Sequence, residues 1–159
     1  MMSNRWDDLT FSPDEKALAA LGSSWAWLLK EPFHPVLFST LGDMFFRYES
    51  EDAIRWLNMG TSEIVQLAET ETLFIAMLRT TTCDEWFMPG LIEQLRAAGK
   101  LLLPTHCYTY VTLPIFAEGK YEVGNLNPVP AWQHFNLRGE MHKQLRELLD
   151  GTNVRIAFD

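Results

Sequence analysis

The residues best suited to chemistry are four histidines and two cysteines. The chain has neither a C-x-x-C nor an H-E-x-x-H pattern, so the ligand pairs of common zinc sites are missing. On a helix, His134 and His142 would lie about 80° apart, and His106 or Cys107 from a nearby strand could complete an ion site. His106 is a poor base for the Cys107 thiol, because neighbours on a strand point to opposite faces. We therefore expect no metal, no cofactor and no catalytic thiol.

Other catalytic patterns are also missing. The chain has no G-x-S-x-G nucleophile turn, no G-x-x-x-x-G-K-[ST] phosphate loop and no G-x-G-x-x-G turn. We expect a protein that is not an enzyme. The alternative is a small-molecule- or metal-binding domain, or an enzyme, with a pocket near His106, Tyr108, His134 and His142.

The carboxylates occur in groups at predicted turns and helix starts, where solvent keeps them ionised. The formal charge is −8, which disfavours direct binding of nucleic acid. Residues 1–94 hold 15 acids and 6 bases, whereas residues 95–159 hold 6 acids and 7 bases. The acidity is therefore regional, and it suits a basic partner.

The elements that would position these groups follow from periodicity. A helix is predicted over 13–29, with Ser12 as its cap, and four short strands over 36–38, 44–48, 53–57 and 63–67 form an antiparallel meander. Helices are predicted over 70–79, with an apolar stripe of Leu73, Phe74, Met77 and Leu78, and over 83–98, interrupted near Pro89-Gly90. Strands at 104–111 and 121–126, a helix at 131–149 and a strand at 154–158 complete an α+β fold, with helices against one face of a largely antiparallel sheet.

Length and composition indicate a single domain, in which an N-terminal helical segment (1–35) is added to an α+β domain (36–159). No stretch approaches eighteen apolar residues, so we expect no membrane span. Two cysteines cannot form a disulfide framework and the N-terminus does not resemble a signal peptide, so we expect a cytoplasmic protein.

A series of short motifs from residue 41 onward resembles a known family. They are LGDMFFR at 41–47, IRWLNMGT at 54–61, GKLLLP at 99–104, CYTY at 107–110, YEVGNL at 121–126 and HFNLRGEMHKQLRELLDG at 134–151. In this order they resemble the C-terminal domain of type VI secretion DNase immunity proteins, which is associated in longer members with a GAD-like domain. The resemblance implies a bacterial cytoplasmic protein that binds a DNA-degrading toxin and blocks it.

Such a toxin needs a cationic surface to hold phosphates, and an acidic inhibitor can compete for that surface. We expect the contacts to come from acids in loops and helix caps, with no membrane and no direct nucleic acid involved. The predicted toxin-binding residues are Glu49, Glu51, Asp52, Glu69, Glu71, Asp84 and Glu85.

Overall fold

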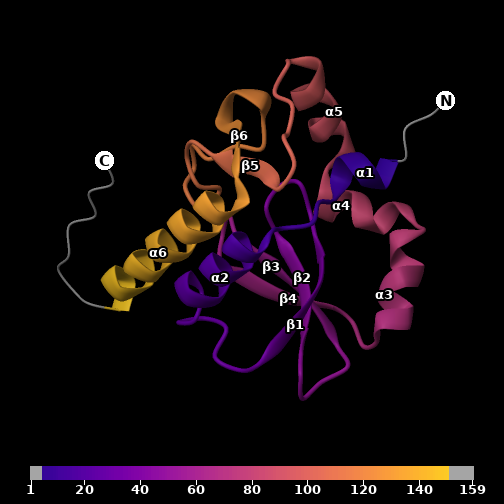
Figure 1. Cartoon of the computed structure of the whole chain (residues 1–159), viewed down its shortest axis with the longest axis vertical. Helices are drawn as coiled ribbons and strands as arrows, with labels where there is room; N and C mark the ends of the chain where they lie inside the picture. The colour runs from indigo at the N-terminus through magenta and orange to yellow at the C-terminus, as the bar shows by residue number, and fades with distance from the viewer. Residues whose placement is uncertain (1–4, 151–159) are drawn as a thin grey trace.

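The structure, a computed structural model, describes residues 5–150. Two short helices precede four strands, three α-helices follow, and a two-stranded sheet leads into a long last helix (Figure 1). The helices are α1 (Arg5–Leu9), α2 (Glu15–Ser24), α3 (Glu71–Leu78), α4 (Asp84–Phe87), α5 (Pro89–Ala97) and α6 (Ala131–Asp150), with 3₁₀ turns η1 (Thr81–Cys83) and η2 (Val123–Asn125). The strands are β1 (Phe33–Phe38), β2 (Met44–Tyr48), β3 (Ile54–Asn58), β4 (Glu63–Ala68), β5 (His106–Tyr110) and β6 (Leu126–Pro130).

The first four strands form one antiparallel sheet in the order β1-β2-β3-β4, which confirms the predicted meander and the α+β class. Each strand pairs with its neighbour in sequence because the turns between them are short. Strands β5 and β6 form a separate antiparallel pair.

The predicted strand at 121–126 is wrong in its position. Residues 123–125 form a 3₁₀ turn, and the strand begins at Leu126. The Asn125 side chain bonds to the backbone of Thr112 and Lys120, and Lys100 Nζ donates to the carbonyls of Val123 and Leu126. These side chains take up the backbone groups that a strand ladder would use, so the chain turns here.

Helices cover both faces of the four-stranded sheet rather than one. On β2, Phe45 packs into a cluster with α3, α4 and α5, whereas its neighbours Met44 and Phe46 pack with α2 and α6. Alternation along a strand sends these side chains to opposite faces. Figure 1 shows α6 and α3 on opposite sides of the strands.

Helix α2 is shorter than predicted, and its cap is Asp14, whose Oδ1 accepts from the Ala17 amide at 2.8 Å. After α2, two tryptophans anchor the chain to α6: Trp25 Nε1 donates to the Phe135 carbonyl at 3.0 Å, and Trp27 Nε1 donates to the Gly139 carbonyl at 3.1 Å. Gly139 allows the end of α2 to lie close against α6, since a Cβ at position 139 would lie 2.5 Å from the Ser24 carbonyl oxygen.

The predicted interruption near Pro89 is confirmed. Met88 has a φ of +48° and Pro89 starts α5, so α4 and α5 are separate helices. None of the helices found between residues 5 and 150 is long and apolar enough to cross a membrane. The strand predicted at 154–158 lies outside the described residues, and the division at residue 35 stays a prediction.

Candidate functional site

The seven predicted acids fall into two groups, one at each end of α3. Glu49, Glu51 and Asp52 lie in the turn between β2 and β3, while Glu69 and Glu71 flank Thr70, the cap of α3. These five residues share one end of the sheet, because Ile54 at the start of β3 pairs with Ala68 at the end of β4. Asp84 and Glu85 begin α4, beyond the other end of α3, which is about 12 Å long.

Three of these acids have a nitrogen-bearing side chain beside them. Glu51 Oε2 lies 2.9 Å from Arg55 Nη2, Asp84 pairs with Arg5, and Glu49 Oε1 lies 3.6 Å from His34 Nε2. The other four, Asp52, Glu69, Glu71 and Glu85, are exposed and form no ion pair with any residue in the range 5–150. Their charge is available to another molecule.

Helix α3, between the two acidic groups, is apolar on nearly all sides. It begins because Thr70 Oγ1 accepts from the Leu73 amide at 3.2 Å, and six apolar residues follow in succession from Leu73 to Leu78. Phe74 alone is fully buried, with its ring centroid 5.7 Å from that of Phe45. Leu73 and Ile75 are 50% and 45% exposed, so the predicted buried stripe is wrong for Leu73. Phe74, with the partly buried Met77 and Leu78, secures the helix to the core, while Leu73 and Ile75 meet solvent.

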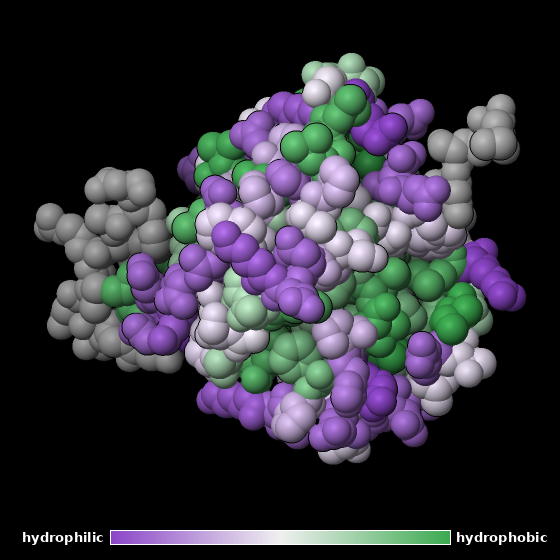
Figure 2. All heavy atoms as spheres, viewed as in Figure 1, coloured by the Kyte–Doolittle hydropathy of each residue, from purple (hydrophilic) through white to green (hydrophobic). Residues whose placement is uncertain are grey.

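Two grooves flank this helix. One, of about 420 Å³, is lined by Leu67 of β4 together with Leu73 and Met77. The other, of about 310 Å³, lies between Ile75 and Leu37 of β1. Figure 2 shows hydrophobic surface gathered over α3, at the right of the view. We call this region the α3 surface: Leu73, Ile75 and the two grooves, with Glu69, Glu71, Asp84 and Glu85 at its ends.

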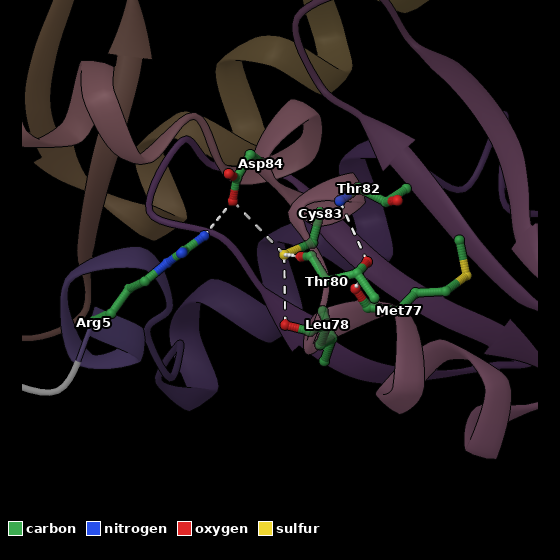
Figure 3. Close-up of polar contacts among 7 residues, drawn as sticks. All are labelled: Arg5, Met77, Leu78, Thr80, Thr82, Cys83 and Asp84. Atoms are coloured by element: carbon green, nitrogen blue, oxygen red, sulfur yellow. Dashed lines mark hydrogen bonds and ion pairs between the residues drawn. The ribbon is translucent and has the colours of Figure 1, made fainter.

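The link from α3 to α4 is held by a cysteine (Figure 3). The Cys83 thiol lies 3.2 Å from the Thr80 carbonyl oxygen and 3.6 Å from that of Leu78, while Thr80 Oγ1 donates to the Met77 carbonyl at 2.7 Å. Burial raises the pKa of the Cys83 thiol, and the nearby Asp84 carboxylate raises it further. The protonated thiol therefore lies against the last residues of α3 on one side and Asp84 of α4 on the other.

The four residues of the alternative pocket do not share one site. His134 Nε2 donates to the Gly42 carbonyl at 3.0 Å, and His142 Nε2 donates to the Met59 carbonyl at 2.9 Å. His106 Nδ1 bonds to the Pro104 carbonyl, and the Tyr108 hydroxyl donates to the Lys100 carbonyl at 2.6 Å. A groove of about 540 Å³ includes His142 in its lining but none of the other three.

Burial keeps the two α6 histidines neutral. It lowers the pKa of His134 to about 3 and that of His142 to about 4. Burial also raises the pKa of the Cys107 thiol far above its ordinary value, which rules out an activated thiolate at that position. Within the described part of the chain, no three His, Cys, Asp or Glu side chains are placed to hold a metal ion.

Sequence reasoning missed the buried carboxyl group of Asp43. Its Oδ1 accepts from the Met59 amide at 2.9 Å, and its Oδ2 accepts from Trp56 Nε1 at 3.1 Å. Burial raises the pKa of Asp43 to about 7, against the lowering effect of these two hydrogen bonds. Asp43 directly follows Gly42 in a turn, a position typical of exposed acids, so no local signal marks it as buried.

A comparison with known protein families gives a match over one part of the chain. Residues 68–142 match the family model described as T6SS immunity protein Tdi1, C-terminal. This match confirms the family that the sequence resembles. The matched segment begins at the end of β4, contains α3, α4, α5, β5 and β6, and ends within α6. The motifs at 41–47 and 54–61 lie outside it. No curated protein matches the chain.

Proposed function

We propose that this chain is an immunity protein that binds a toxin of a type VI secretion system and neutralises it without catalysing a reaction. The match of residues 68–142 to the Tdi1 immunity family carries the proposal. The matched segment contains Leu73, Ile75 and the four acids of the α3 surface. The groove-lining residues outside it are Trp6, Thr10, Leu37 and Leu67. Blocking by binding requires an exposed surface rather than a catalytic site, and this segment supplies one.

We propose further that the toxin degrades DNA and that the complex forms in the cytoplasm. The charge of −8, with the acids concentrated in residues 1–94, supports a partner with a cationic surface. A nuclease has such a surface because it must hold phosphates. The acids proposed to meet it are those predicted from the sequence: Glu49, Glu51, Asp52, Glu69, Glu71, Asp84 and Glu85.

The test is co-expression with the secretion-system toxin encoded beside the gene for this chain. Cells that express the toxin alone should stop growing and lose intact chromosomal DNA. Cells that also express this chain should grow and keep their DNA, and the two proteins should purify as one complex.

Two results would separate the parts of the proposal. If no complex forms and growth is not restored, the chain is not the immunity protein for that toxin. If growth is restored but the toxin leaves DNA intact in unprotected cells, immunity stands and the DNase assignment is wrong.

A further inference from the structure

We propose that the apolar centre of the α3 surface, Leu73 and Ile75 with the flanking grooves, is the anchor on which the toxin docks. This inference rests on the proposed function. It assigns the larger part of the binding energy to two residues that are not among the predicted acids. The occupant is a protein surface with projecting apolar side chains surrounded by Lys or Arg.

The first argument comes from exposure. Phe74 already fixes α3 to the aromatic cluster around Phe45, Trp86 and Phe87. Leu73 and Ile75 lie on either side of Phe74 and remain about half exposed. Apolar side chains gathered over a helix, with recessed apolar surface on both flanks, are typical of a protein interaction site.

The second argument is charge. Residues 68–87 contain four acids, Glu69, Glu71, Asp84 and Glu85, and one base, Arg79. Arg5 of α1 adds a second base through its ion pair with Asp84. An apolar centre with a charged rim is the usual arrangement of a binding interface, in which the centre holds the partner and the rim steers its approach.

The same charges disfavour a parallel pairing of α3 with the α3 of a second copy of this chain. Glu69 and Glu71 lie at the start of α3, so two α3 helices packed in parallel would bring these acids opposite each other. Like charges directly opposed across an interface are unfavourable. A partner with a cationic rim meets no such repulsion.

The test compares two helical residues of equal exposure. Ile75 in α3 and Leu137 in α6 are both 45% exposed. Binding of Ile75→Glu and Leu137→Glu to a catalytically inactivated form of the same toxin is measured by biolayer interferometry. Glutamate adds the same charge at both positions and keeps the rim acidic, so a difference between the variants reports on the apolar contact.

We expect Leu137→Glu to bind within about twofold of the wild-type chain, and Ile75→Glu to bind at least about 30-fold more weakly, which is the loss expected for an interface hot spot. Leu73→Ser provides a second test that adds no charge, and thermal unfolding monitored by circular dichroism verifies that each variant is folded.

Three results would overturn the proposal. In the first, the wild-type chain binds and folded Ile75→Glu and Leu73→Ser bind equally well; the proposed function then stands and the anchor lies elsewhere. In the second, sedimentation shows a dimer of this chain that Ile75→Glu dissociates, so a second copy covers the surface. In the third, the wild-type chain itself fails to bind, and the proposed function falls first.

Discussion

Helices α6 and α3 cover opposite faces of the same sheet, and they use their side chains differently. Helix α6 buries two polar side chains, His134 and His142. His134 donates to the Gly42 carbonyl before β2, and His142 donates to the Met59 carbonyl after β3. Helix α3 has no charged residue after Glu71, yet it leaves Leu73 and Ile75 about half exposed. The buried polar groups of α6 thus find hydrogen-bond partners within the chain. The α3 face carries more apolar side chains than its own packing uses, and this excess marks it as the face for a partner.

The largest predicted effect is a loss of stability in the core beneath α3, compared with a much smaller loss at the exposed side of α3. Phe45 contacts the rings of Trp56, Phe74, Trp86 and Phe87, so Phe45→Ala should lower the free energy of unfolding by about 3–5 kcal/mol. Leu73→Ala should lower it by less than about 1 kcal/mol, because the side chain is half exposed. Urea denaturation measures both. Similar losses for the two variants would mean that Leu73 belongs to the core.

The next effect tests the close contact of α2 with α6. A Cβ at Gly139 would meet the Ser24 carbonyl oxygen at 2.5 Å, so Gly139→Ala should destabilise the protein by about 1–3 kcal/mol. Gly22 on α2 has nothing within 4 Å of a built Cβ, and Gly22→Ala should stabilise by up to about 1 kcal/mol through helix propensity. Thermal unfolding of the two variants distinguishes them. Stabilisation by both would show that the helices are not in contact at Gly139.

A smaller effect depends on pH and on the α6 face. His142 has a folded-state pKa of about 4 against 6.5 for the free side chain, so only the unfolded chain takes up a proton as pH falls from about 6.5 to 4. The contribution of neutral His142 to stability is therefore full above pH 6.5 and decreases below it, by about 1.4 kcal/mol per pH unit for one proton.

His142→Gln keeps a donor for the Met59 carbonyl and removes this proton, so its stability should fall less steeply than that of the wild-type chain between pH 6.5 and 4. The raised pKa of Asp43, about 7, makes stability increase as pH falls, which is opposite to the effect of His142. Asp43 has this effect in the wild-type chain and in His142→Gln alike, so it cancels when their slopes are compared. Urea denaturation at a series of pH values gives the slopes, and parallel slopes would contradict a neutral buried His142.

The smallest effect concerns the acids at the ends of α3. The triple variant Glu69→Gln, Glu71→Gln, Glu85→Gln should slow toxin association about tenfold at low salt and leave dissociation nearly unchanged. The difference should vanish near 0.5 M salt, where screening is strong. The matched control neutralises three exposed acids elsewhere, Glu118, Glu122 and Glu140. Equal slowing by both variants would mean that net charge matters and position does not.

Local signals allowed much of the fold to be predicted. Short turns gave the four strands, the acids Glu69 and Glu71 gave the start of α3, and Pro89 gave the break before α5. Contacts between residues distant in sequence carry no local signal. The burial of Asp43 depends on Trp56 and Met59, and the roles of the α6 histidines depend on carbonyls more than 80 residues away.

The candidate site was predicted in part, for a related reason. Acids at turns and caps can be recognised from sequence, and four of the seven predicted acids are exposed and form no ion pair with another described residue. The exposure of Leu73 and Ile75 could not be recognised, because a run of six apolar residues in a helix does not tell which ones the core will cover.

The most direct test of the account is amide hydrogen exchange of this chain with and without bound toxin. We predict that toxin binding slows exchange chiefly in residues 65–80, which span the end of β4 and all of α3, and leaves the exposed side of α2 and α6 unchanged. Slower exchange confined to α2 and α6, with α3 unchanged in a complex that forms, would contradict the central claim that the α3 surface is where the toxin is held.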